Sequence, residues 1–288
     1  MTRWLVTGSA GMLGRDLMAC LSGRQATVLG LRRAELDVTD ARRVLAVIRD
    51  YNPDIVVNCA GWTAVDAAET DEASARAANG AGAGNIASAC AETGALMAHI
   101  STDYVFDGLA REPYAEDADP APSTAYGRSK LAGERAVRAL LPDRALIVRT
   151  SWLYGGQGPS FVHTMIGLAA TSRAVDVVAD QRGQPTWTLD VADQVVALAV
   201  AGRLGVYHAT SSGDATWFEL AREVFALAGA DPDRVRPVSS EAFPRPAPRP
   251  AYSVLGHDRH RAIGLPPIGD WRAALRRAWP AIGGQPAR

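Results

Sequence analysis

The sequence predicts an α/β protein in which a doubly wound parallel sheet is accompanied by a smaller C-terminal α/β substrate domain. Two observations predict this fold class. Short apolar runs alternate with helix-like segments in the first half of the chain, and the first run ends in a glycine-rich turn. After residue 155 the alternation weakens and prolines become denser. We expect one domain over residues 1–155, to which the chain returns at 187–212, and a second over 156–186 and 213–288.

Composition and charge limit the class of protein. The 288 residues carry a formal net charge of -1, so there is no basic field of the kind that attracts nucleic acid. The three cysteines, Cys20, Cys59 and Cys90, are scattered, which favours free thiols over a disulfide framework or a zinc site. No signal peptide is apparent, and the apolar runs are shorter than the about 20 residues of a membrane span. We expect a cytoplasmic protein without a membrane or nucleic-acid partner.

The first element is a buried strand around Trp4–Val6, followed by three glycines at intervals of three residues and by a helix start. Glycine allows positive φ and a close approach of the backbone to a phosphate. The helix would direct its free N–H groups at a pyrophosphate. The pattern predicts a dinucleotide site that includes Gly8, Gly11, Met12 and Leu13, although a tight turn without a ligand would also fit.

The second strand, Thr27–Leu31, ends in Arg32 and Arg33. Sites selective for NAD usually carry an acidic residue there, whereas a guanidinium suits the 2′-phosphate of NADP. We therefore expect NADPH, bound in part by Arg32. Two solvated arginines would give the same pattern, so NADH stays possible. Asp37 and Val38 follow and are expected beside the adenine.

The third strand, Pro53–Asn58, runs into a stretch of small residues. Small residues just beyond the carboxyl end of a strand leave room for a flat ligand at the edge of a doubly wound sheet. Ala60, Gly61 and Thr63 are therefore candidate contacts of the cofactor.

Three further strands complete the expected sheet. An alanine-rich helix over 71–92 precedes a strand at Leu96–Ile100, which delivers Thr102 to the same sheet edge. The Thr102 hydroxyl could hydrogen-bond a reacting carbonyl, or it could simply cap the loop. A strand at Ala145–Val148 follows, and the chain is expected to return to the sheet around Val206–His208.

A Tyr-x-x-x-Lys pair, Tyr126 and Lys130, follows a polar loop over 108–124. Positions i and i+4 of a helix share a face, so the phenol and the ammonium could act on one bound molecule. A neighbouring cation favours the phenolate, so we expect a lowered pKa for Tyr126 and a role in proton transfer. Taken alone, the spacing also fits two unrelated residues on a solvated helix.

Four longer strings make the pattern more specific. They are Asn58–Asp66, Ser101–Gly108, Arg149–Gly155 and Asp180–Thr186. Together with the glycine turn and the Tyr/Lys pair, they resemble the extended short-chain dehydrogenase/reductases, and among these the dTDP-4-dehydrorhamnose reductases of the RmlD type. The resemblance extends from Leu5 to about Leu275.

The resemblance implies a Rossmann-like, NADPH-dependent enzyme that reduces the C4 ketone of a dTDP-4-keto-6-deoxyhexose, such as dTDP-4-dehydrorhamnose to dTDP-L-rhamnose. It implies that Tyr126 donates a proton to the alkoxide, that Lys130 holds the nicotinamide ribose and that Thr102 binds the carbonyl oxygen. The sugar-site residues that it implies are Val105, Phe106, Trp152, Gln184 and, for the diphosphate, Arg249. Trp152 would otherwise be interpreted as an ordinary core aromatic.

Alternatives stay open. The same chemistry could act on another dTDP-4-keto sugar of natural-product biosynthesis, such as a dihydrostreptose-type sugar. A sugar-nucleotide epimerase or dehydratase would share the fold, although the acidic pair typical of a dehydratase is missing, because Asp103 is followed by Tyr104. A non-catalytic binding relative would tend to lose the Tyr/Lys pair. A homodimer is possible.

No metal is expected. Some relatives use Mg²⁺ through acidic side chains, and Asp16 follows the glycine turn, but Leu189 stands where the second acidic ligand would be. The stretch His257–His260 is interpreted as a solvated turn, because it has no matching ligands elsewhere in the chain.

Overall fold

The computed structural model describes residues 2–171 and 173–283. At its centre lies a parallel sheet of six strands in the order β10-β5-β4-β3-β1-β2. The strands are β1 (Arg3–Thr7), β2 (Thr27–Leu31), β3 (Ile55–Asn58), β4 (Leu96–Thr102), β5 (Ala145–Thr150) and β10 (Gly205–His208). The order reverses between β1 and β3, so the predicted doubly wound fold is confirmed, and the carboxyl ends of these two strands flank the crevice in which such sheets bind ligands.

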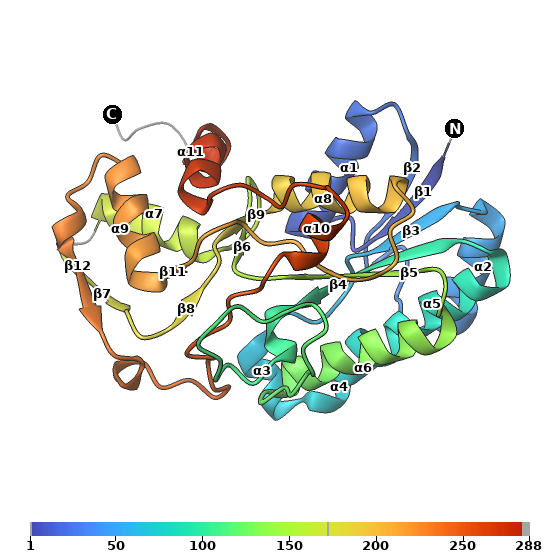
Figure 1. Cartoon of the computed structure of the whole chain (residues 1–288), viewed down its shortest axis with the longest axis horizontal. Coiled ribbons are helices and arrows are strands. Elements are labelled where there is room, and N and C mark those ends of the chain that lie inside the picture. The colour runs from blue at the N-terminus through green and yellow to red at the C-terminus, as the bar shows by residue number, and fades with distance from the viewer. Residues whose placement is uncertain (1, 172, 284–288) are drawn as a thin grey trace.

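Helices cover both faces of the sheet (Figure 1). They are α1 (Met12–Gly23) and α8 (Thr188–Val200) on one face, and α2 (Ala41–Tyr51), α5 (Gly82–Thr93) and α6 (Ala125–Leu140) on the other. Successive strand residues alternate between the two cores: Val6 and Val57 belong to the first, Leu5 and Val56 to the second. Because both faces are buried, the strands consist of nearly continuous apolar runs.

The helix expected over 71–92 has that extent, but it is not regular. It consists of α4 (Glu72–Arg76), a π-helical turn over Ala77–Ala81 and α5. The π-turn carries Asn79, whose amide donates to Ser129 Oγ of α6 at 2.8 Å and whose Oδ1 accepts the Trp62 N–H at 2.8 Å. A short helix that the sequence pattern did not indicate, α3 (Val65–Thr70), precedes it.

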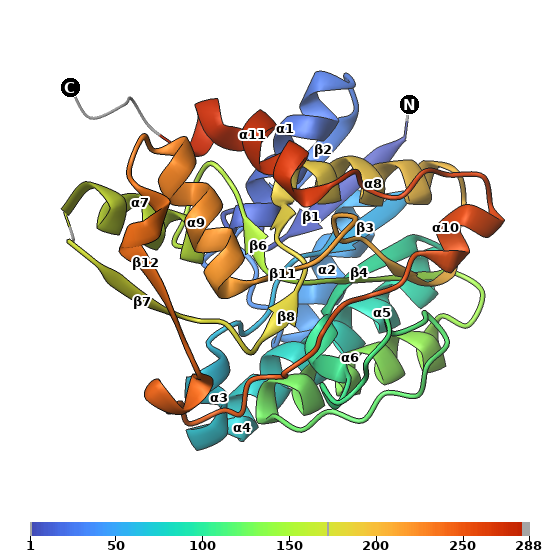
Figure 2. The ribbon, with the colours of Figure 1, turned by 60° about the vertical axis from the view of Figure 1, so that its left-hand side comes forward.

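A further group of helices and short strands lies beside the sheet, as Figure 2 shows, and its buried side chains form a third core. It is built from α7 (Phe161–Thr171), α9 (Trp217–Leu227), α11 (Trp271–Ile282) and the parallel pair β7 (Val175–Val178) and β12 (Val235–Val238). The shorter elements are β6 (Leu153–Tyr154), β8 (Arg182–Gly183), β9 (Thr186–Trp187), β11 (Ala215–Thr216), α10 (Asp258–Ala262) and the 3₁₀ turns η2 (Asp103–Val105), η3 (Pro232–Arg234) and η4 (Ser240–Ala242). The exact domain boundaries stay a prediction.

The interpretation of His257–His260 as a solvated turn is wrong for the two histidines, whereas Asp258 and Arg259 between them are exposed. His257 and His260 are 6% and 0% exposed, because α10 packs them towards the sheet. His257 Nε2 lies 2.9 Å from Thr210 Oγ1, and the His260 ring meets the Tyr207 ring edge-on. Burial lowers the pKa of both imidazoles to about 4, so both are neutral at pH 7.

Across residues 2–171 and 173–283, no helix combines the length and the apolar character that spanning a membrane requires.

Candidate active site

The predicted cofactor residues line one cavity of about 1090 Å³ at the carboxyl edge of the sheet. Its wall includes Gly8, Gly11, Met12, Leu13, Arg32, Asp37, Val38, Ala60, Gly61, Thr63, Tyr126 and Lys130, together with Thr102 and Trp152. The cavity therefore combines the predicted cofactor contacts, the predicted catalytic residues and one predicted sugar contact. It lies at the reversal of strand order, where doubly wound sheets bind dinucleotides.

The glycine turn after β1 is shaped to receive a phosphate group. Gly8 has a φ of +67°, and a Cβ there would lie 2.7 Å from the backbone of Cys59 and Ala60. Helix α1 begins directly after the turn, and its N-cap, Gly11, provides no side chain to occupy the first N–H groups. This bare helix start fits a pyrophosphate, which would accept hydrogen bonds from those groups.

The two arginines after β2 differ in their surroundings. The Arg32 guanidinium pairs with Glu35 at 3.3 Å between Nε and Oε1. Arg33 lines the same cavity, and its side chain makes neither a hydrogen bond nor an ion pair with any residue in the described ranges. The Asp37 carboxylate attracts Arg33 without forming an ion pair, whereas Glu35 pairs directly with Arg32, so Arg33 is better placed than Arg32 to receive a 2′-phosphate.

Lys130 lines the cavity and is buried. It lies on the second turn of α6, which begins after the N-cap Thr124. Its ammonium donates to Ile100 O at 2.6 Å. Burial lowers the pKa of Lys130 to about 8, and the carboxylate of Glu134 opposes this shift. The ammonium form therefore still predominates at neutral pH.

The expected low pKa of Tyr126 is corrected by the structure. Burial raises the pKa of the phenol to about 12, a hydrogen bond with the Thr102 side chain opposes the shift, and the charge of Asp103 adds to it. The expectation considered only the cation of Lys130 and left out the cost of burying a phenolate. Tyr126 is therefore a neutral phenol that can donate a proton.

Asp103 is a residue at this edge to which the motifs gave no role. Thr102 Oγ1 donates to Asp103 Oδ1 at 2.9 Å and accepts the Tyr104 N–H at 3.2 Å. Burial raises the pKa of the Asp103 carboxyl to about 6. Because a hydroxyl carries a single proton, Thr102 can donate to a carbonyl only if it turns away from Asp103. An acidic residue directly after a buried strand was the available signal.

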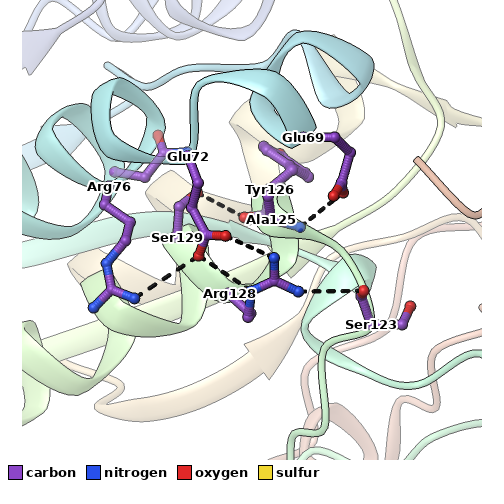
Figure 3. A network of polar contacts seen from close by, with 9 residues as sticks. Glu69, Glu72, Arg76, Ser123, Ala125, Tyr126, Arg128 and Ser129 are labelled. Carbon is purple, nitrogen blue, oxygen red and sulfur yellow. Dashed lines mark hydrogen bonds and ion pairs between the residues drawn. The ribbon is translucent and has the colours of Figure 1, made fainter. Parts of the chain in front are cut away.

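A network of polar contacts ties the start of α6 to α3 and α4 (Figure 3). Glu69 accepts the Ala125 N–H at 2.8 Å. The Arg128 guanidinium donates to both carboxylate oxygens of Glu72, at 3.1 and 2.7 Å. These contacts fix the helical turn that carries Tyr126. The sequence gives no sign of them, because the partners are 56 positions apart.

Two predicted sugar-site residues do not reach the cavity. Val105 is fully buried and Phe106 is 3% exposed, and both belong to a small core with Leu131 and Leu255. The Phe106 ring stacks on Tyr114 with 4.3 Å between centroids. Their side chains therefore pack behind the cavity wall, which does not match the expected place in the sugar pocket.

Gln184 and Arg249 are also engaged elsewhere. The Gln184 amide donates to Ser211 O at 3.0 Å and to Leu255 O at 3.1 Å, and its Oε1 accepts the Leu255 N–H at 2.8 Å. The Arg249 guanidinium pairs with Asp66 at 2.8 Å. Gln184 lines a separate cavity of about 380 Å³. Neither side chain lines the main cavity, so their predicted substrate contacts would need rearrangement.

Trp152 does line the cavity, in a strained conformation. Its φ is +44°, a left-handed value that is rare for a bulky residue and that is commonly found at functional sites. The ring stacks on Trp217 with 3.4 Å between centroids, and a Cβ on Gly183 would lie 2.5 Å from it. Stacking on Trp217 and close packing against Gly183 fix the orientation of this ring.

Asp16, the one acidic residue considered for Mg²⁺, accepts a hydrogen bond from Thr188 Oγ1 at 2.5 Å. No group of three His, Cys, Asp or Glu side chains within residues 2–171 and 173–283 is arranged to hold a metal ion. The expectation that the protein needs no metal stays a prediction.

Comparison with known proteins gives consistent matches over the whole chain. The family of the RmlD substrate binding domain matches residues 2–282. A dTDP-4-keto-6-deoxy-D-glucose reductase of Streptomyces niveus is 52% identical over 97% of this chain and 97% of its own length. A dTDP-4-dehydrorhamnose reductase of Streptomyces griseus is 53% identical over 99% and 96%. The crystal structure of dTDP-4-dehydrorhamnose reductase from Bacillus anthracis, in complex with NADP, superposes with a TM-score of 0.94 at 38% identity, covering 97% and 99% of the two chains.

Proposed function

The chain belongs to the RmlD substrate-binding domain family, and from this membership we propose that it is an NADPH-dependent reductase of dTDP-4-keto-6-deoxyhexoses. We propose dTDP-4-dehydrorhamnose, reduced at C4 to dTDP-L-rhamnose, as its substrate. One observation carries this proposal: Thr102, Tyr126 and Lys130 line the same cavity as the glycine turn after β1.

The residues of the cavity fit NADPH, which supplies the hydride for C4 when it is bound. Gly8 and Gly11 would receive the pyrophosphate, and Arg33 the 2′-phosphate. Lys130, kept mainly as an ammonium ion, would hold the nicotinamide ribose and stabilise negative charge.

Proton transfer is assigned to Tyr126. Its phenol is neutral at pH 7, and burial, which raises its pKa to about 12, reinforces this state, so it has a proton to give to the developing alkoxide. Thr102 would turn its hydroxyl from Asp103 towards the same oxygen, and Trp152 would pack against the sugar.

Two relatives of nearly equal similarity differ in the sugar that their names give. The two Streptomyces relatives are 52% and 53% identical to this chain, and their names differ in the sugar that is reduced. This near-equal similarity favours one alternative, reduction of dTDP-4-keto-6-deoxy-D-glucose by the same residues.

A panel of two substrates tests the proposal. Purified protein is mixed with NADPH and either dTDP-4-dehydrorhamnose or dTDP-4-keto-6-deoxy-D-glucose, oxidation of the cofactor is followed by absorbance, and the product is identified by NMR. We expect one NADPH consumed per product and a clear preference for dTDP-4-dehydrorhamnose. Turnover without net cofactor oxidation would indicate an epimerase or dehydratase, and no turnover with either sugar would contradict the proposal.

A homodimer in the cytoplasm completes the proposed description. Sedimentation velocity of the purified protein tests the dimer, and a single species at the monomer mass of 30.4 kDa would contradict it.

A further inference from the structure

A buried ion pair lies directly behind the candidate active site. The Arg149 guanidinium donates to both oxygens of the Glu134 carboxylate, at 2.9 and 2.8 Å, and each side chain is 2% exposed. Ser101 Oγ donates to the same carboxylate at 2.5 Å. We call Ser101, Glu134 and Arg149 the buried clamp. Neither Glu134 nor Arg149 lines the cavity, so neither can be explained as a direct ligand contact.

The buried clamp joins the elements that carry the catalytic candidates. Ser101 is the neighbour of Thr102 at the end of β4. Arg149 lies opposite Ser101 in the register of β4 and β5. Glu134 is one helical turn after Lys130 on α6, so the two side chains share a face. A single carboxylate therefore links Ser101, the neighbour of the residue that would bind the carbonyl, to the helix that carries Tyr126 and Lys130.

The buried clamp is not explained by its contribution to the stability of the fold. A buried ion pair is often no more stabilising than an apolar replacement, because desolvation offsets the attraction between the charges. The other groups around Arg149 are neutral: the Phe106 ring at 5.0 Å, Glu116 O at 3.5 Å, and His208, whose imidazole stays uncharged because burial places its pKa well below the usual range.

The surroundings of Lys130 show what the carboxylate can do. Ile100 O accepts from the ammonium, the Cys59 thiol is protonated because burial raises its pKa to about 12, and burial keeps His99 neutral by lowering its pKa. Against these uncharged groups, the Glu134 carboxylate acts to raise the pKa of Lys130. Glu134 thus supplies negative charge near an ammonium whose pKa is lowered by burial.

We propose that Glu134 is a positioning residue for the reductase reaction: held by Arg149 and Ser101, it keeps Lys130 charged and holds Thr102 in register with Tyr126. This inference rests on the proposed function, because it assigns the clamp to the same site. It goes beyond that function by giving residues outside the cavity a measurable effect on the protonation of a residue inside it.

Charge variants of the full-length protein test the direction in which Glu134 and Arg149 shift the pKa of Lys130. In Glu134→Gln the shape is kept but the Arg149 cation is left behind, so Lys130 should deprotonate at lower pH. In Arg149→Gln the carboxylate is left unpaired, so Lys130 should deprotonate at higher pH. The alkaline limb of kcat/KM against pH should move down by about one unit in the first variant and up in the second. The alkaline limb of the double variant should lie between those of the two single variants.

Two further measurements keep the test decisive. The pH dependence of NADPH binding, followed by cofactor fluorescence without any sugar, should shift in the same directions, so a wrong sugar assignment would leave this result intact. Where a single charge variant does not fold, the uncharged double variant and Ser101→Ala are used. Ser101→Ala should lower kcat about fivefold without moving the alkaline limb, because it removes the tie between Glu134 and β4 while both charges of the ion pair stay in place.

A merely structural role would give lower melting temperatures with unchanged pH profiles. Superimposable alkaline limbs in wild type and the charge variants, for both turnover and NADPH binding, would overturn the proposal for Lys130. Wild-type kcat in Ser101→Ala would overturn the proposed register of Thr102.

Discussion

The cofactor side and the sugar side of the cavity differ in how the chain builds them. All twelve residues predicted for the cofactor line the cavity, whereas Trp152 is the one predicted sugar residue of five that does so. The cofactor side consists of turns that directly follow β1, β2 and β3, together with the start of α6. The sugar side depends on packing between the sheet and the third core, which α7, α9 and α11 form. A local motif can therefore locate the first side, whereas the second requires the assembled fold.

The largest expected effect lies where the two sides meet. Tyr126→Phe removes the proposed proton donor, so kcat should fall by about 10²–10⁴ while the KM values for NADPH and sugar change little. Tyr104→Phe is the matched control, because its ring lies edge-on to Tyr126 with 5.6 Å between centroids and also lines the cavity. Similar losses in both variants, measured by steady-state kinetics, would show that Tyr126 has no special role.

Asp103 tests whether burying a carboxylate where the two sides meet lowers the stability of the protein. Its pKa is raised to about 6 in the fold, so stability from the protonated form is complete below the unfolded value and is lost as the pH rises through 6. Asp103→Asn should therefore stabilise the protein relative to wild type at pH 8 by about 1–3 kcal/mol more than at pH 4. Denaturant unfolding at both pH values measures this difference.

Asp107 provides the control of opposite sign. The Tyr114 hydroxyl and the Leu109 N–H donate to its carboxylate and lower its pKa, so its stabilising contribution is present at neutral pH and is lost as the pH falls. Asp107→Asn should be slightly destabilising at pH 8. The same sign for both variants would contradict the assignment of Asp103 as a buried charge that costs stability.

A pair of glycine substitutions tests whether the cofactor side and the sugar side can be disturbed independently. Gly8→Ala places a Cβ against the backbone of Cys59 and should raise the Kd for NADPH about tenfold, with the sugar KM unchanged. Gly183→Ala pushes on the Trp152 ring and should raise the sugar KM about tenfold, with NADPH binding unchanged. Cofactor fluorescence and steady-state kinetics measure the two parameters. If both variants changed the same parameter, the two sides would not be independent.

The differences between expectation and structure have physical causes. The sheet and the glycine turn were predictable because hydrophobic period and turn chemistry are local properties. The pair of Glu134 and Arg149 was not, because it joins α6 to β5 across 15 positions. The π-turn over Ala77–Ala81 interrupts an alanine-rich stretch that fits a regular α-helix equally well. The pKa of Tyr126 was misjudged because burial depends on the whole fold.

The smallest expected effect concerns the two arginines after β2, and it sharpens the description of the cofactor side. Arg33→Ala should reduce the preference for NADPH over NADH about tenfold, because it removes a cavity-lining cation that forms no ion pair within the described ranges and is attracted only by the charge of Asp37. Arg32→Ala should reduce it only two- to threefold, since Glu35 already neutralises that guanidinium and both side chains are exposed to solvent. KM values for both cofactors in the two variants decide between them. A larger loss in Arg32→Ala would mean that NADPH displaces Glu35 and that Arg32, the residue expected from the sequence, holds the 2′-phosphate.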